Sequence, residues 1–315
     1  MRDKILELLK KDCFISGEQL AKNLSVSRTA VWKQIKNLKK LGYEIKSVKN
    51  KGYKLISRPD IPIPEEITLG LETKIIGKKF FYYESLDSTN TLAKQKIKKK
   101  VPEGTLIIAD VQTSGRGRKN RNWHSPEGGL WFSVVLYPHI PPQKAMLITM
   151  TCSISAAQAI KEITGLKPVI KWPNDLLIND KKVCGILTEL DAEIDRINYT
   201  IVGIGINVNN SLDDCLKKKA TSLIKETGSK ISSVKLLRSF LKYMDKNYCK
   251  LISDDYGYIR DLWFSYSNII GKEILVRDEK DVTAGVVLDV DNDGCLILEN
   301  NDGVKRILSG DIEYM

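Results

Sequence analysis

Residues 105–122 read TLIIADVQTSGRGRKNRN, a strand-like apolar run that leads into a cationic loop. The loop, residues 115–122, combines two glycines with four cations: Arg116, Arg118, Lys119 and Arg121. Such a segment cannot enter a core, but glycines let backbone N–H groups turn toward an anion and arginines present forked donors. We therefore predict a sheet that carries an anion-binding loop. A solvated basic hairpin or a nucleic-acid-binding arm is the alternative.

The chain around this loop, residues 67–268, alternates between strand-like and helical stretches. LWFSVVLY, PVIKWP, VCGILTEL and YTIVGIGINV have the composition of strands, and AMLITMTCSISAAQAIKEI that of a long helix. ESLDSTNTLAKQKIKKK opens a further helix. This pattern is typical of an α+β or α/β domain with one sizeable sheet.

Residues 1–60 have the pattern of a winged helix-turn-helix. Helices are expected over residues 5–9 and 17–24, and Ser27 is a good N-cap for a third helix that stops at Gly42. YEIKSV and YKLI then flank turn residues, which predicts a β-hairpin. The third helix has the shape that enters a major groove of DNA.

Positive charge is concentrated in these first sixty residues. They hold 15 Lys and Arg against 6 Asp and Glu, a net charge of +9 out of +11 for the whole chain. Cations that neutralise phosphates release counterions, so this asymmetry favours a DNA partner over a merely solvated basic domain. Trp32 either contacts a base edge or packs against the hairpin. The candidate DNA-binding residues are Ser27, Arg28, Thr29, Trp32, Lys33, Lys36, Lys49 and Lys51.

Composition bounds the class of protein. At 315 residues the chain is long enough for two or three domains with real cores. It has no run of 18 uninterrupted apolar residues and no signal-peptide core, so we expect a cytoplasmic protein without membrane contact. The six cysteines stand singly and there are only two histidines, which argues against a zinc site or a disulfide framework.

Two domain boundaries follow from composition. SRPDIPIPEE holds three of the ten prolines, so residues 61–66 are expected to form a stiff, extended linker. From residue 269, EILVR, AGVVLDV, CLILEN and KRILSG alternate with Asp, Asn and Gly turns, which predicts a small β-domain over residues 269–315.

Four polar constellations fall at the ends of the predicted elements. They are DSTN at residues 87–90, Gln112 with the arginine loop, KWPND at residues 171–175 and GIGIN at residues 203–207. Helix capping alone would explain DSTN, but a lysine on a buried strand is unusual, and strand glycines indicate close approach of a backbone or ligand. Together they predict a site for an anion plus a planar or amide-bearing molecule.

The ordered set DSTN, QTSGRGR, KWPND, KVCGIL and GIGINVN behind a winged helix resembles the bifunctional bacterial biotin protein ligases, also called biotin operon repressors. The resemblance covers all three predicted domains. It implies an α+β architecture with a central mixed-sheet biotin/lipoyl ligase-like domain and a C-terminal SH3-like barrel. It also implies that biotin and ATP form biotinyl-5′-adenylate and pyrophosphate, and that biotin passes to a lysine of a biotin carboxyl carrier protein, such as that of acetyl-CoA carboxylase.

By motif match, the resemblance also implies site residues. Lys171 would stabilise transition-state charge, and Arg118 would hold the carboxylate and phosphate together. Residues 113–127 are expected to be mobile when empty and to close over the ligand with Trp123 as a cover. The biotin-binding candidates are Ser88, Thr89, Asn90, Gln112, Gly115, Arg116, Gly117, Arg118, Lys171 and Gly185; the ATP-binding candidates are Arg118, Arg121, Asn174, Lys182 and Asn207.

Two further expectations concern the nucleotide side of the site. Mg²⁺ is expected on the ATP phosphates, with Asp175 as a candidate protein ligand. Some repressor-type relatives stack adenine on a tryptophan, whereas ATSL at residues 220–223 has no aromatic side chain. The adenine contacts of this chain are therefore expected to differ.

The sequence allows three interpretations of the whole chain. It could be an enzyme with an accessory N-terminal domain, a regulator with a sensing pocket, or both at once, and the full motif set favours both. In the joint interpretation the adenylate promotes a two-fold homodimer that binds operator DNA. A ligase for lipoate or octanoate would share the fold class.

Overall fold

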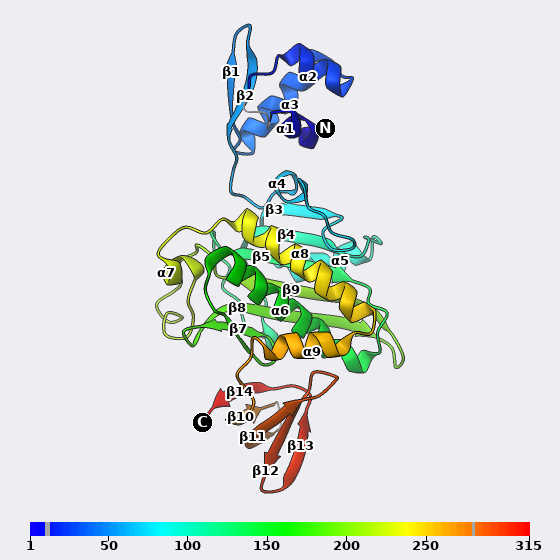
Figure 1. Ribbon diagram of the computed structural model, residues 1–315, viewed down its shortest axis with the longest axis vertical. Coiled ribbons are helices and arrows are strands. Elements are labelled where there is room, and N and C mark those ends of the chain that lie inside the picture. The colour runs from blue at the N-terminus through cyan, green and yellow to red at the C-terminus, as the bar shows by residue number, and fades with distance from the viewer. Residues whose placement is uncertain (10–12, 279–280) are drawn as a thin grey trace. The chain divides into compact units, whose positions relative to one another are not determined.

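The computed structural model describes residues 1–9, 13–278 and 281–315, which form two compact units, Met1–Gly70 and Leu71–Met315 (Figure 1). The first unit holds helices α1 (Arg2–Leu9), α2 (Gly17–Leu24) and α3 (Arg28–Lys40), then the hairpin strands β1 (Glu44–Val48) and β2 (Gly52–Ser57). Ser27 begins α3, because its hydroxyl accepts a hydrogen bond of 3.1 Å from the Ala30 backbone N–H. The predicted winged helix-turn-helix elements are confirmed.

The linker predicted over residues 61–66 is wrong in its second half. Pro64–Thr68 form a short helix, α4, in which proline takes a first-turn position that needs no N–H donor. Glu66 of α4 is buried and accepts hydrogen bonds from the Tyr43 hydroxyl at 2.6 Å and from Arg58 at 3.2 Å. These bonds tie the segment to the first unit, so it does not extend freely.

The second unit is built on a seven-stranded sheet in the order β3-β4-β5-β9-β8-β7-β6. Among the described pairings β3 and β4 run parallel, and every other neighbouring pair runs antiparallel. The predicted mixed sheet is thereby confirmed. The strands are β3 (Phe80–Leu86), β4 (Thr105–Gln112), β5 (Leu130–Leu136), β6 (Val169–Lys171), β7 (Asp175–Ile178), β8 (Lys181–Ala192) and β9 (Ile197–Ile206).

Helices cover both faces of this sheet. Phe132 of β5 packs edge-to-face on Phe240, with ring centroids 5.1 Å apart, whereas Val135 of β5 packs with Ala93. Because alternate side chains of a strand point to opposite faces, the helices that carry Phe240 and Ala93 lie on opposite sides. The first side is covered by α6 (Ala145–Thr164), α8 (Ser233–Ile252) and α9 (Tyr256–Phe264), as Figure 1 shows, and the other by α5 (Thr89–Ile97).

Short helices complete the unit: η1 (Arg118–Asn120), η2 (Pro142–Lys144) and α7 (Leu223–Thr227). None of the helices in the described part of the chain has both the length and the apolar composition needed to cross a lipid bilayer.

The C-terminal part is a five-stranded antiparallel sheet in the order β13-β12-β11-β10-β14. Its inner face buries Val287, Leu298 and Ile312. The predicted small β-domain is confirmed, while closure into a barrel stays a prediction, since the pairings among the described strands end at β13 and β14. The strands are β10 (Glu273–Arg277), β11 (Val282–Val290), β12 (Leu296–Asn300), β13 (Gly303–Ile307) and β14 (Asp311–Tyr314).

Candidate active site

A cavity of about 400 Å³ opens where the arginine loop meets strands β8 and β9 on the α5 side of the sheet. Every residue that the sequence placed in the pocket lines this cavity except Gly115 and Lys171. Gly115 lies just behind it, where an added Cβ would come within 2.3 Å of the Trp123 carbonyl oxygen. The structure thus brings together motifs that are scattered over more than a hundred residues of sequence.

The floor of the cavity exists because two glycines face each other across neighbouring strands. Gly185 of β8 is paired with Gly205 of β9. The indole of Trp123 lies over them: a Cβ added at Gly205 would be 2.5 Å from Trp123 Nε1, and one added at Gly185 would be 2.8 Å from its ring. The close approach predicted for the strand glycines is therefore made here by the predicted cover residue. The Trp123 N–H is buried and has no hydrogen-bond partner among the described residues.

One end of the cavity is a buried network of neutral polar groups. The Ser133 hydroxyl donates to Asn90 Oδ1 at 2.6 Å and contacts Thr89 Oγ1 at 2.7 Å. Gln112 Oε1 accepts hydrogen bonds from both the backbone N–H and the hydroxyl of Thr89, at 2.8 and 3.1 Å. Because their mutual bonds fix these side chains, the remaining hydrogen-bonding capacity points at the cavity in a set geometry.

Ser88 resolves the alternative that DSTN only caps a helix. It occupies the N-cap position of α5, and its side chain makes no capping hydrogen bond. The residue is buried, 3% exposed, and lines the cavity. Its hydroxyl is thus available to a ligand.

The other end of the cavity is cationic. The loop forms a tight hairpin in which the Gly117 N–H donates to the Arg121 carbonyl at 2.7 Å. Arg118 and Arg121 line the cavity and both contact the carboxylate of Asp311, Arg118 at 3.7 Å. Burial alone would raise the pKa of Asp311, but the hydrogen bond from Arg121 and the neighbouring cations hold this pKa below its ordinary value.

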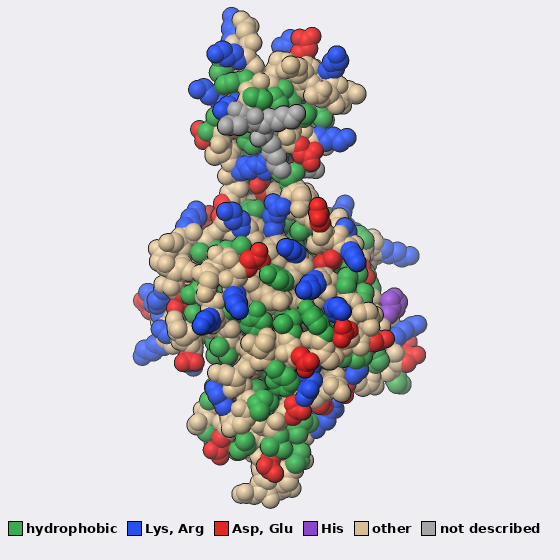
Figure 2. Space-filling model, viewed as in Figure 1, with side chains coloured by type: hydrophobic (Ala, Val, Ile, Leu, Met, Phe, Trp, Pro, Cys, Tyr) green, Lys and Arg blue, Asp and Glu red, His purple; other side chains and the backbone are tan. Residues whose placement is uncertain are grey.

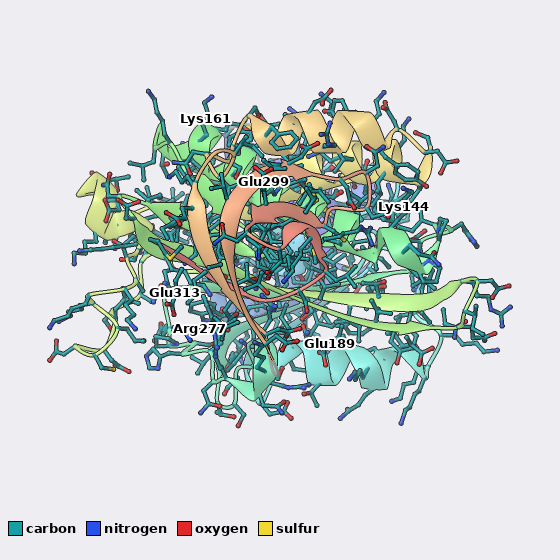
Figure 3. All side chains as sticks on the ribbon, turned by 90° about the horizontal axis from the view of Figure 1, so that it is seen from below. Lys144, Lys161, Glu189, Arg277, Glu299 and Glu313 are labelled. Carbon is teal, nitrogen blue, oxygen red and sulfur yellow. The ribbon has the colours of Figure 1, made fainter. Side chains whose placement is uncertain are left out.

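Glu189 of β8 joins the loop to the neutral end. Its carboxylate accepts from Asn90 Nδ2 at 2.7 Å and lies 3.3 Å from Arg116 Nη1 and 3.1 Å from Lys94 Nζ of α5. Figure 3 shows Glu189 beside α5. Burial would raise the pKa of Glu189, but the hydrogen bonds from Asn90 and Lys94 and the charge of Arg116 hold it below its ordinary value. The carboxylate therefore stays ionised.

Lys182 lines the cavity beside Asp175 and Trp123, and Lys219 lines it from the segment after β9. The Lys182 Nζ lies 2.7 Å from Asp175 Oδ1 and 5.0 Å from the Trp123 ring centroid. The sequence had placed Lys171 at this central position. Lys171 instead ends β6, outside the cavity lining, and its ammonium stands 5.5 Å from the ring centroid of Tyr314 in the C-terminal sheet. The Lys171 ammonium is thus within cation–π distance of this ring and does not line the cavity.

Sequence reasoning missed one wall of the cavity. Leu212 and Leu216 line it, together with Ala220 of the ATSL stretch considered above for adenine, from the segment between β9 and α7. The signal was available, because these are apolar positions spaced by four residues in an otherwise charged stretch, SLDDCLKKKA. Asp311 was missed as well, and no local pattern marks it.

The predicted DNA-binding residues are exposed on the first unit. Arg28, Thr29, Lys33 and Lys36 are exposed on α3, and Figure 2 shows several Lys and Arg side chains on the visible face of this unit. Trp32 is 52% exposed, and the Lys36 ammonium lies 5.3 Å from its ring centroid, so half of the indole surface is open to a partner. Ser27 is occupied as the α3 cap, and Lys49 and Lys51 are exposed at the hairpin turn.

Comparisons with known proteins agree with this division. The pattern of the Biotin/lipoate A/B protein ligase family matches residues 82–207, that of an HTH domain residues 2–54, and that of the Biotin protein ligase C terminal domain residues 269–315. The last match begins at the predicted boundary.

Individual relatives are similar over almost the whole chain. It is 43% identical to Bifunctional ligase/repressor BirA of Bacillus subtilis (strain 168), over 99% of this chain and 98% of that protein. The protein of the same name from Escherichia coli (strain K12) is 28% identical over 98% and 95%. The structure of biotin protein ligase from Aquifex aeolicus in complex with biotin and ATP has a TM-score of 0.62 and 31% identity, covering 76% of this chain and 99% of that one. The chain belongs to the family of bifunctional biotin protein ligases and repressors.

Proposed function

We propose that this protein joins biotin to ATP, forming biotinyl-5′-adenylate and pyrophosphate, and transfers biotin to one lysine of a biotin carboxyl carrier protein. It also binds operator DNA and represses transcription of biotin synthesis or uptake genes. The observation that carries the proposal is a single cavity with a buried neutral network at one end and a cluster of cations at the other. The first end suits the ureido ring of biotin, and the second suits a polyphosphate.

The chemistry needs position and charge more than it needs a base. A biotin carboxylate is already ionised at neutral pH, so its attack on the α-phosphorus requires no proton removal. The barrier comes from bringing two anions together and from charge that builds on pyrophosphate. Lys182 and Arg118 face the place where carboxylate and α-phosphate would meet, and such fixed cations lower this barrier.

The predicted side chains divide between the two substrates in this scheme. Ser88, Thr89, Asn90 and Gln112 bind the biotin ring, Trp123 covers it, and Arg121, Asn174 and Asn207 serve the nucleotide. Leu212, Leu216 and Ala220 offer adenine an apolar wall, which replaces the missing aromatic. Lys171 is assigned a lesser role, because its ammonium faces Tyr314.

Mg²⁺ would arrive on the phosphates of ATP. The carboxylate of Asp175 lines the cavity and meets the Lys182 ammonium, so it could take one position on such an ion. Among the described residues no three His, Cys, Asp or Glu side chains gather in a metal-binding group. The donor set therefore fits an ion held mainly by phosphate oxygens, whose charge it would partly neutralise.

The N-terminal unit gives the second activity. The exposed face of α3 with Trp32, Arg28 and Thr29 would read base edges, while Lys49 and Lys51 would contact phosphates. In this scheme the adenylate promotes a two-fold homodimer, whose paired helices reach the half-sites of a palindromic operator.

A truncated chain of residues 71–315 tests whether biotin transfer belongs to the second unit and DNA binding to the first. It should still transfer biotin to a purified carrier domain and should lose binding to DNA from upstream of the biotin genes. Operator binding equal to that of the full chain would show that the winged helix is not the DNA reader. Sedimentation of the full chain with and without adenylate tests the dimer: an unchanged mass would remove it.

A further inference from the structure

The C-terminal sheet places one carboxylate among the cations of the arginine loop. Asp311, at the start of β14, contacts Arg121 and lies 3.7 Å from both Arg118 Nη1 and Lys119 Nζ. Its side chain is 29% exposed and lines the cavity. Among the described residues it is the only carboxylate within ion-pair distance of these three cations.

Backbone carbonyls of the same sheet add two more contacts. Arg118 Nη1 donates to the Gly310 carbonyl at 3.2 Å, and Lys119 Nζ donates to the Arg277 carbonyl at 3.3 Å. Arg118 Nη1 also lies 3.1 Å from Asn174 Oδ1 of the central domain. The guanidinium of Arg118 is therefore held from both sides, by β14 and by the turn that precedes β7.

A glycine sets the position of Asp311. Gly310 has a φ of +155°, and a Cβ there would lie 2.3 Å from Val276 Cγ1 of β10. Only glycine lets the chain pass this close to β10 in this conformation. The strand then starts with its carboxylate directed at the loop.

Asp311 could either stabilise the loop or block the anion site, and the net charge of the cluster distinguishes these two effects. Three cations within four residues repel one another, so a loop that converges them on one point needs an anion to stabilise it. One carboxylate against three cations leaves a net charge of +2, which still attracts a triphosphate. A carboxylate of this kind stabilises the loop before the ligand arrives and does not neutralise it.

We propose that Asp311 is a positioning residue for nucleotide activation, which holds Arg118 and Arg121 at the cavity before ATP binds. The C-terminal sheet is then part of the active site through this residue. The inference rests on the proposed nucleotide site. Its effect is preorganisation: Asp311 raises the closed population of a loop that still opens in the empty protein, so less order has to be gained at the expense of ATP affinity.

The test compares Asp311→Asn with Glu313→Gln in the full-length protein. Glu313 lies two residues further along β14, and its carboxylate pairs with Arg277 on the exposed side of the sheet, as Figure 3 shows. Asp311→Asn should raise the KM for ATP about tenfold, because the loss of two or three partly exposed ion pairs corresponds to about a tenfold change in an equilibrium constant. The KM for biotin should change less than about twofold. Glu313→Gln should leave both values unchanged.

A second readout needs no activity. Trypsin cuts after Arg and Lys, so cleavage of the ligand-free protein within residues 116–121 reports how firmly the loop is held. It should be about tenfold faster in Asp311→Asn than in the wild type, in proportion to the open population, and unchanged in Glu313→Gln. The double variant Arg121→Gln, Asp311→Asn should raise the KM for ATP little more than Arg121→Gln alone, because both remove the same pair.

Three results would overturn the inference. A lower KM for ATP in Asp311→Asn would mean that the carboxylate competes with phosphate. Equal rises for ATP and biotin, with a lower melting temperature, would mean a general structural role. Unchanged trypsin cleavage in Asp311→Asn would mean that Asp311 does not hold the loop. This conclusion is independent of catalysis. A wild-type protein without biotin-dependent pyrophosphate exchange would instead contradict the proposed function.

Discussion

The two ends of the cavity differ in how they are built. At the neutral end, which we propose binds biotin and call the biotin end, Thr89, Asn90 and Ser133 are at most 3% exposed and are joined by short hydrogen bonds between neutral groups. At the cationic end, which we propose binds the nucleotide and call the nucleotide end, the Arg121 side chain is 63% exposed and forms an ion pair with Asp311. Buried hydrogen-bonding groups reject a ligand that leaves them unpaired, whereas exposed charges attract any polyanion and are screened by salt. The biotin end should therefore determine which carboxylic acid is accepted, and the nucleotide end should determine the affinity for ATP and the rate of adenylate formation.

The largest effect is expected where the two ends meet. Lys182→Met should lower kcat/KM for biotin-dependent pyrophosphate exchange by about 100- to 1000-fold, as loss of a cation at developing charge does. Lys171→Met, the matched control, should cost about tenfold or less, because its ammonium rests on Tyr314. Equal losses in the two variants would contradict the assignment of the central position to Lys182.

The biotin end can be disturbed alone through Gly203. A Cβ there would lie 2.3 Å from Asn90 Oδ1, so Gly203→Ala should displace that side chain and raise the KM for biotin about 10- to 100-fold, in line with the cost of overpacking a core. The KM for ATP should hardly change.

Gly257→Ala on α9 is the control for this variant, since nothing lies within 4 Å of its added Cβ. If Gly203→Ala weakened ATP and biotin equally, the two ends would not be separable.

Salt should distinguish the ends without mutation. Raising the ionic strength from about 0.05 to 0.5 M shortens the screening length severalfold and should raise the KM for ATP about three- to tenfold, with the KM for biotin within about twofold. The measurement is steady-state exchange at several concentrations of a neutral salt. Parallel rises would mean that charge governs both ends.

The smallest effect is expected from pH at the biotin end. The pKa of Glu189 is held below its ordinary value, so its bond to Asn90 is present above that range and is lost only as the pH falls through the lowered pKa. Biotin affinity should thus change less than about twofold between pH 7 and 5.5, given an ordinary glutamate pKa of about 4.3. Tryptophan fluorescence titration can follow it, and a marked loss by pH 6 would show that Glu189 does not anchor this end in its charged form.

Local patterns were the part of the structure that the sequence could predict. Ser27, the apolar spacing of α3 and the turn residues of the hairpin act over a few positions, so their elements were predicted closely. The same holds for the pocket motifs, each of which is a short stretch at the end of a strand. β3 was missed because FFYYESL shows no apolar alternation, and the four-residue β7 was too short to stand out.

The errors concern side chains whose surroundings are set over long distances. Lys171 and Lys182 are both strand lysines near the pocket motifs, and they differ in their aromatic neighbours, Tyr314 of the C-terminal sheet for Lys171 and Trp123 for Lys182. Asp311 meets the loop across 190 residues of sequence. Glu66 was predicted to lie in an extended linker, but its carboxylate accepts a hydrogen bond from the Tyr43 hydroxyl, 23 residues away in the sequence. Tertiary packing determines the surroundings of such side chains, and the periodicity of the sequence does not predict tertiary packing.

Exchange of labelled pyrophosphate into ATP, measured with biotin and with lipoate on the purified full-length protein, tests the central claim most directly. The neutral end should accept biotin and leave groups unpaired with lipoate, so exchange should depend on biotin and stay at background with lipoate. Absence of exchange with biotin, or equal exchange with both acids, would contradict the account.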